Sequence, residues 1–240
     1  MVSKGSIAAR GYFSSELLLY LASLGEEPGQ RLPSIRELSE QLGVSTGKLR
    51  EQLEVARELG LVEVRPKTGI RTRAFSFYDT LRTGLRFALA IDPDCFEQFG
   101  LLRTHIEASF WKSAVACLQE QDKQELKQLV ARAWDKLNGN PVQIPHDEHR
   151  ALHLAIFKRF NNPFVKGMLE AYWDAYETVG MDLYTDYAYL REVWSYHDRM
   201  VQAILIDDPQ AGYEALVEHT GLIHHRPEVG AYQPQSTLPA

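Results

Sequence analysis

At 240 residues, with 45% apolar and 24% charged residues, the chain has the composition of a globular protein with room for one or two domains. No apolar run approaches the roughly 20 residues that a membrane-spanning helix needs. The first residues also lack the apolar core of a signal peptide, so we expect a cytoplasmic protein with no membrane partner. Two cysteines, Cys95 and Cys117, are too few for a disulfide framework.

The net charge of −6 is unevenly distributed along the chain. Residues 1–75 hold 11 Lys/Arg and 9 Asp/Glu, whereas the remainder holds 15 and 23. Because salt screens a charge beyond roughly 8–10 Å, local placement matters more to a nucleic-acid partner than the total. Arg65, Lys67, Arg71 and Arg73 gather in one short segment, where they can meet phosphates. The acidic total therefore does not exclude DNA.

Two helices are predicted first. The apolar stretch Phe13–Leu24 favours a supporting helix, which Pro28-Gly29 follows as a break. Ser34 stands three residues before Glu37, which is the spacing of a capping box at the start of a second helix. Gly43 ends that helix with a tight turn.

A third helix and a β-hairpin follow. Ser45 is a natural N-cap, and Leu49 and Leu53 give the next helix an apolar face. Residues 60–72 have strand character on both sides of a turn at 66–69. Helix, turn, helix and basic hairpin make a winged helix-turn-helix, whose second helix enters the major groove of double-stranded DNA. The residues expected at the DNA are Arg36, Ser45, Thr46, Gly47, Lys48, Arg50, Arg65, Lys67 and Gly69. Taken singly, each charged residue in this set could also be a solvated surface side chain with no DNA contact.

Three motifs lie in this region: Leu32-Pro33-Ser34-Ile35-Arg36-Glu37-Leu38-Ser39, Leu59-Gly60-Leu61-Val62 and Arg65-Pro66-Lys67-Thr68-Gly69. With them, most of residues 13–74 resembles the DNA-binding domain of the GntR family of bacterial regulators. The resemblance implies a transcriptional regulator, which we expect to bind a palindromic operator as a homodimer. Thr46 stands where many members have a base-reading Arg, although Arg50 is retained, so the operator sequence does not carry over.

Helical periodicity dominates the rest of the chain. The predicted helices are Tyr78–Ala90, Cys95–Gln119, Gln124–Leu137, His146–Phe160, Pro163–Tyr176, Leu183–Asp207 and Pro209–His224. Short links between them favour an antiparallel all-α bundle of six to seven helices. The predicted fold is therefore mainly α, with a winged helix-turn-helix domain over residues 1–75 and the bundle over 76–226. Residues 227–240, which are polar and rich in proline, predict a disordered tail.

Four histidines have spacings that suit a metal site. His149 and His153 are four residues apart, so they share one helix face. His197 and His219 lie 11 residues on either side of Asp208, and an antiparallel helix pair would place them at the same height. Imidazoles gathered inside a bundle suit zinc, nickel or another late divalent metal. The alternative is that each is an ordinary core or surface histidine.

The bundle also resembles the FCD ligand-binding domain of FadR-type GntR regulators. The matching residues are His153 with Asn162 nine positions later, His197 with His219 a further 22 positions along, and the first-helix segment Leu101–Glu107. The resemblance implies a metal whose open positions accept the carboxylate of a small organic acid, with Arg103 as its second partner. Arg103 can instead form an i,i+4 ion pair with Glu107. His149 stands where the family has Asp, and this puts its role as a ligand in doubt.

The leading hypothesis is an allosteric, metal-dependent transcriptional regulator without enzymatic activity. Three alternatives remain: a metal-sensing regulator in which the ion is the signal, a metal-dependent hydrolase fused to a DNA-binding head, and a bundle that only dimerises. The hydrolase is disfavoured because no carboxylate near His149 and His153 in the sequence has an evident general-base role. Asp147 and Glu148 should project from other faces of that helix.

Overall fold

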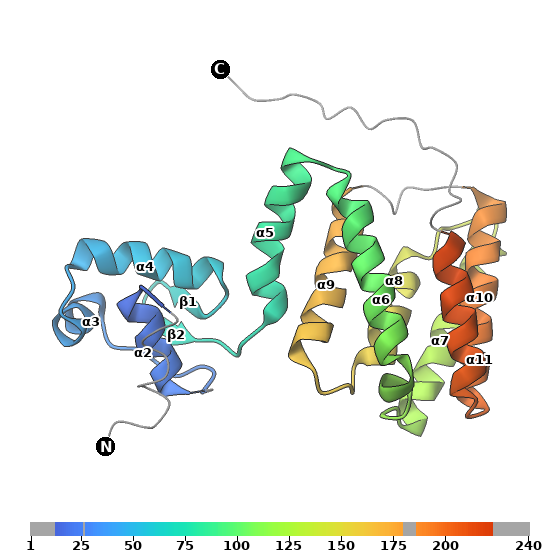
Figure 1. Cartoon of the computed structure of the whole chain (residues 1–240), viewed down its shortest axis with the longest axis horizontal. Helices are drawn as coiled ribbons and strands as arrows, with labels where there is room; N and C mark the ends of the chain where they lie inside the picture. Colours follow the sequence, from blue (N-terminus) through green and yellow to red (C-terminus); the bar gives the residue numbers. More distant parts are fainter. Residues whose placement is uncertain (1–12, 26, 180–185, 223–240) are drawn as a thin grey trace. The chain divides into compact units, whose positions relative to one another are not determined.

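The computed structural model describes residues 13–25, 27–179 and 186–222. Within them lie ten helices, labelled α2 to α11, and one two-stranded sheet (Figure 1). The chain divides between Asp92 and Pro93 into two compact units. The predicted class, mainly α with a winged helix-turn-helix followed by a helical bundle, is confirmed. The predicted tail, residues 227–240, lies outside the described residues. No helix in the described part of the chain is long and apolar enough to cross a membrane.

The helices of the first unit begin where short polar side chains cap them. Ser34 accepts a hydrogen bond from the backbone N–H of Glu37, whose carboxylate accepts one from the backbone N–H of Ser34 at 2.8 Å, so the predicted capping box is present. Gly43 ends the same helix at φ 67°, and Ser45 caps the next. The elements are α2 (Glu16–Leu24), α3 (Ile35–Leu42), α4 (Thr46–Glu58), β1 (Val62–Arg65) and β2 (Gly69–Thr72).

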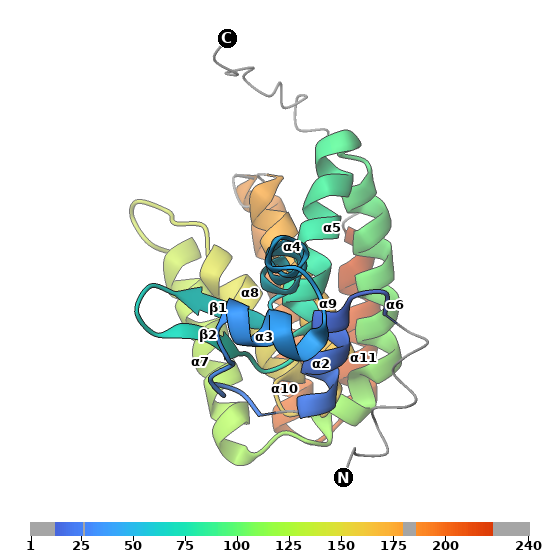
Figure 2. The same cartoon turned by 90° about the vertical axis from the view of Figure 1, so that its left-hand side faces the viewer.

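The wing is an antiparallel hairpin that projects from the three helices (Figure 2). Its register pairs Val62 with Thr72 and Arg65 with Gly69. Gly69 at φ 81° and Lys67 at φ 69° close the turn with left-handed backbone. Val62 is buried among the leucines of α2, α3 and α4, so the hairpin is anchored at one end and exposed at its turn.

Helix α5 (Phe77–Ile91) groups with the first unit, which differs from the predicted boundary after residue 75. Buried Asp79 explains the difference, because its Oδ2 lies 3.0 Å from Nη2 of Arg73 at the end of the wing. It also packs against Gly60, where an added Cβ would lie 2.4 Å from Cβ of Asp79. Helical periodicity places Phe77–Ile91 in a helix, but it does not show which unit the helix joins.

The second unit is a closed arrangement of helices that lie side by side (Figure 1). Among its described residues the helices are α6 (Cys95–Val115), α7 (Glu120–Leu137), α8 (His146–Phe157), α9 (Pro163–Thr178), α10 (Tyr187–Leu205) and α11 (Pro209–Gly221). Each helix contacts the next in the cyclic order α6, α9, α8, α7, α10, α11, and α6 also contacts α8. Side chains that point inward from any of them therefore share one interior.

Two contacts shape the ends of these helices. The backbone N–H of Gln119 donates to Asp122 at 2.8 Å, so α7 begins four residues earlier than predicted and α6 ends at Val115. Buried Trp111 of α6 donates its Nε1–H to the carbonyl of Pro209 at 2.9 Å, at the start of α11. Helices distant in sequence are thus held in register around the interior.

Candidate metal centre and nucleic-acid interface

Four imidazoles from three helices come together inside the second unit. One ligand atom from each of His149, His153, His197 and His219 lies within 4.8 Å of the other three. His153, His197 and His219 are almost fully buried, and His149 is half-buried. The ring centroids of His197 and His219 lie 4.4 Å apart, because α10 and α11 are adjacent and the two residues flank their connecting turn symmetrically. The spacing in the sequence thus corresponds to a juxtaposition in space.

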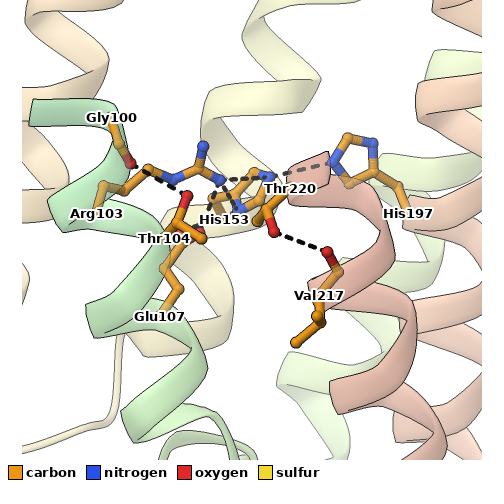
Figure 3. A network of polar contacts seen from close by, with 8 residues as sticks. All are labelled: Gly100, Arg103, Thr104, Glu107, His153, His197, Val217 and Thr220. Carbon is orange, nitrogen blue, oxygen red and sulfur yellow. Dashed lines mark hydrogen bonds and ion pairs between the residues drawn. The ribbon is translucent and has the colours of Figure 1, made fainter. Parts of the chain in front are cut away.

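A carboxylate and a guanidinium adjoin this cluster (Figure 3). Arg103 and Glu107, both on α6, form an ion pair with Nη2 and Oε2 2.7 Å apart. Oε1 of Glu107 lies 3.0 Å from Nδ1 of His153, whose Nε2 lies 3.1 Å from Nε2 of His197. Nη2 of Arg103 is 3.1 Å from the same Nδ1. The predicted pairing of Arg103 with Glu107 is therefore present, and Arg103 also lies beside the histidines.

The contact between Glu107 and His153 was not predicted from the sequence. The two residues are 46 positions apart on different helices. The sequence indicates Glu107 only through its i,i+4 spacing from Arg103 and through the resemblance of Leu101–Glu107 to the first FCD helix. A carboxylate does therefore lie next to the cluster. Both of its oxygens face Arg103 or His153, so it is placed to orient an imidazole rather than to act as a general base.

Burial sets the charges at this centre. It holds the pKa of His197 and of His219 well below 6.5, and neighbouring imidazoles lower both further. Burial likewise lowers the pKa of His153, although Glu107 opposes the shift. Burial alone would raise the pKa of Glu107, but Arg103 and His153 outweigh it and bring that pKa to about 2. At neutral pH the three buried imidazoles are uncharged beside an ionised ion pair.

This donor set fits a late divalent metal. A metal ligand must be a neutral imidazole, which burial already favours here. The bond to Glu107 is consistent with a proton on Nδ1 of His153, which leaves the lone pair on Nε2, the atom that faces His197. Nδ1 of His197 and Nδ1 of His219 are buried and have no hydrogen-bond partner among the described residues, which is unusual for polar atoms inside a protein. A cation bound by the four histidines would account for their convergence.

A small cavity of about 40 Å³ adjoins the histidines. Arg103, His149 and His219 line it, together with aromatic side chains that include Tyr172 and Trp194. The guanidinium carbon of Arg103 lies 4.7 Å from the centroid of the Tyr172 ring, so the aromatic wall holds the cation in place. Arg103 therefore lies between the imidazoles and the cavity wall.

The residues predicted at DNA lie on the surface of the first unit. Thr46, Gly47, Lys48 and Arg50 are exposed on the first turns of α4, and Ser45 caps that helix. Three of the cations form exposed ion pairs, namely Arg36 with Glu40, Lys48 with Glu16 and Arg65 with Glu63. Exposed pairs of this kind contribute little, so phosphates can compete for these cations. Lys67 and Gly69 lie at the exposed turn of the wing.

Each of the two units matches a known domain family. The FCD domain model matches residues 100–222, and the model of the bacterial regulatory proteins of the gntR family matches residues 21–71. The chain is 25% identical over 208 residues to the HTH-type transcriptional regulator YieP of Escherichia coli K12, covering 85% of this chain and 89% of that protein. It is 22% identical over 215 residues to the HTH-type transcriptional regulator YcbG of Bacillus subtilis 168, covering 88% and 87%.

Among solved structures, Streptococcus agalactiae GntR has a similar fold, with a TM-score of 0.63 at 20% identity over 94% of this chain and 99% of that one. The winged helix-turn-helix, the helical second unit and the two family matches lead to the same assignment. The chain belongs to the gntR family of bacterial regulatory proteins: it is a DNA-binding transcriptional regulator whose second unit carries an FCD domain.

Proposed function

We propose that the second unit is an allosteric sensor that holds a divalent metal, zinc or nickel, on His149, His153, His197 and His219. In this proposal a small organic acid binds in the adjoining cavity and alters operator binding by a homodimer. The observation that carries the proposal is the convergence of four imidazoles, three of them buried, from three helices. Imidazole ligands favour late divalent metals over magnesium or calcium, which prefer oxygen.

A bound ion would supply positive charge and open coordination positions for a carboxylate. Arg103 is the second partner in the proposal, because a planar guanidinium binds a carboxylate through two parallel hydrogen bonds. Its ion pair with Glu107 does not use all of its donors, since the buried Nε of Arg103 has no hydrogen-bond partner among the described residues. Pairing with Glu107 and recognition of the acid are therefore compatible.

Regulation requires that the acid favour one arrangement of the two DNA-binding heads over another. A coupling of about 1–3 kcal/mol is typical of allosteric proteins and would change operator affinity roughly 5- to 150-fold. The proposal assigns no enzymatic role, because Glu107 is held by Arg103 and His153.

The test is the metal content of the purified full-length protein after dialysis. We expect about one zinc or nickel ion per chain, and we expect His197→Ala to abolish its retention. His105→Ala is the matched control, because His105 is an exposed residue of α6, and it should retain the ion. Unchanged metal content in His197→Ala would refute the site. A crystal structure of the metal-replete protein would show any co-purified acid, and anomalous scattering at the zinc and nickel edges would identify the ion.

A metal-sensing regulator is the second candidate. It is favoured by the four imidazoles themselves, which offer an ion four ligands without any contribution from an effector. The two candidates differ in metal exchange. A sensor should exchange its ion with chelators of graded affinity over a regulatory range, whereas a resident ion should survive dialysis against all but the strongest of them.

A further inference from the structure

The four histidines of the cluster differ in their access to solvent. His153, His197 and His219 are 1%, 0% and 2% exposed, whereas His149 is half-buried. His149 and His219 both reach the wall of the adjoining cavity, and His153 and His197 are not among the residues that line it. Of the four, His149 therefore combines a place at the cavity wall with access to solvent.

The three buried histidines have the make-up of a three-ligand zinc site. Their ring centroids lie between 4.4 and 5.7 Å from one another. Glu107 holds His153 in place through the contact of 3.0 Å between Oε1 and Nδ1 (Figure 3). Zinc sites with three protein imidazoles keep a fourth position for another ligand. Three histidines can thus hold the ion while the fourth position changes its occupant.

A zinc ion bound by all four imidazoles has no open position, since zinc with four protein ligands is almost always tetrahedral. A carboxylate then reaches the ion either as a fifth ligand or by replacing one of the four. Replacement of a buried histidine would leave its imidazole inside the protein without a ligand or water, which costs free energy. Replacement of His149 avoids this cost, because its half-buried side chain can turn toward solvent.

The cavity leads a carboxylate to the position of His149. Arg103 and His149 line it together, and Nη2 of Arg103 lies 3.1 Å from Nδ1 of His153. The guanidinium therefore lies next to the imidazole cluster, on the side that faces the cavity. A carboxylate that pairs with Arg103 there approaches the ion where His149 lies.

We propose that His149 is an exchangeable ligand, which the carboxylate of the effector replaces on the ion while the three buried histidines stay bound. The inference rests on the proposed function and specifies how the acid enters the centre. The coordinate bond from His149 breaks and one from a carboxylate oxygen forms, so the ion keeps four ligands. Neither a proton nor an electron is transferred. Release of His149 from the ion is then the first structural consequence of acid binding on α8.

The test is a titration of cobalt-loaded full-length protein with acetate, in which the visible absorption of Co²⁺ in place of zinc is recorded. Four-coordinate cobalt absorbs much more strongly than five- or six-coordinate cobalt. We expect acetate to shift the absorption bands without a large loss of intensity, because an oxygen replaces a nitrogen and the number of ligands is unchanged. Acetamide, which has nearly the same shape without the charge, should leave the spectrum unchanged.

A substitution of His149 distinguishes an exchangeable ligand from an obligatory one. Unlike His197→Ala, His149→Ala should retain the ion through dialysis, and it should bind acetate about tenfold or more tightly because no imidazole occupies the fourth position. His146→Ala is the matched control, because His146 lines the same cavity from the start of α8 but lies outside the cluster. It should not tighten acetate binding. Tryptophan fluorescence reports the fold of both variants, and the spectrum of the unsubstituted protein decides the question if His149→Ala does not fold.

The possible outcomes separate this inference from the function on which it rests. A large loss of absorption intensity on addition of acetate would show that the carboxylate adds to four histidines, which refutes the exchange and leaves carboxylate sensing in place. Loss of cobalt from folded His149→Ala, or an unchanged acetate affinity in that variant, would refute the exchange as well. A spectrum that acetate does not alter in either protein would overturn both the exchange and carboxylate sensing. Loss of cobalt from the unsubstituted protein during dialysis would overturn the metal site itself.

Discussion

Nδ1 of His153 lies 3.0 Å from Oε1 of Glu107, and neither side chain is exposed to solvent. A carboxylate in this position fixes which imidazole nitrogen carries the proton and holds the ring in one orientation. Loss of such a partner from a histidine ligand typically costs 10- to 100-fold in metal affinity. Glu107 is therefore a positioning residue for the proposed centre rather than a ligand.

Glu107→Gln should lower zinc affinity by about 10- to 100-fold while the protein stays folded. Competition with a chromophoric chelator measures the affinity, and tryptophan fluorescence reports the fold of the second unit. Glu97→Gln is the control, because Glu97 lies exposed in the first turn of the same helix. Equal zinc affinity in the two variants would show that Glu107 does not act through His153.

The metal-free second unit should lose stability as the pH falls below about 6.5. His153, His197 and His219 have lowered pKa values in the folded state, chiefly because of burial, so the unfolded chain binds more protons in this range. Their contribution to stability is therefore fully present above the unfolded pKa of about 6.5 and is lost as the pH falls toward their folded values. The pKa of Glu107, about 2, keeps that carboxylate out of this window.

Urea unfolding in the presence of EDTA, at pH 7.5 and at pH 5.5, tests this expectation. All four tryptophans (Trp111, Trp134, Trp173 and Trp194) lie in the second unit, so their fluorescence reports that unit alone. His219→Asn removes one titrating imidazole and should reduce the difference between the two pH values. Greater stability at pH 5.5 than at pH 7.5 in the unsubstituted protein would contradict the assignment of neutral buried imidazoles.

Arg50 is expected to contact DNA from the exposed side of α4. Arg50→Ala should weaken operator binding by about 1–3 kcal/mol if the side chain contacts a base edge, which is roughly 5- to 150-fold in Kd. Arg57→Ala is a control on the same helix, because Arg57 lies at its other end and pairs with Glu54 at 2.7 Å. Titration at a fixed salt concentration gives both affinities, and equal losses would argue against α4 as the recognition helix.

Gly212 of α11 packs against Trp111 of α6. An added Cβ would lie 2.8 Å from Cζ2 of Trp111, so Gly212→Ala should destabilise the second unit by about 1–3 kcal/mol through overpacking. Gly221→Ala, at the end of the same helix, has open space around the added methyl group and should not destabilise it. Unfolding followed by tryptophan fluorescence compares the two, and similar midpoints would show that the indole can move aside.

Much of this structure could be predicted because the signals are local. Ser34 with Glu37, and Gly43, fix the ends of α3 by contacts within a few residues. The convergence of His197 and His219 is also a local property, since the residues flank a single turn between adjacent antiparallel helices. Regular spacing can predict such features because the geometry of a helix relates position in the chain directly to position in space.

The parts that could not be predicted depend on packing between distant segments. Asp79 joins α5 to the first unit through Gly60 and Arg73, although nothing in the periodicity of α5 indicates that unit. Glu107 meets His153 only because α6 and α8 line the same interior. Asp79 and Glu107 are both buried carboxylates that contact residues of other elements. The tertiary fold determines which residues these are.

The three histidine-bearing helices are connected only through the chain and their packing, and His153 and His197 are 44 residues apart. An ion on the proposed centre would therefore stabilise the folded state, because it binds four side chains that converge only when the chain is folded. Newly made copies without metal would then unfold more often and be degraded sooner. On this basis, metal supply would govern how many regulator molecules survive in the cell, in addition to how each one responds to its signal.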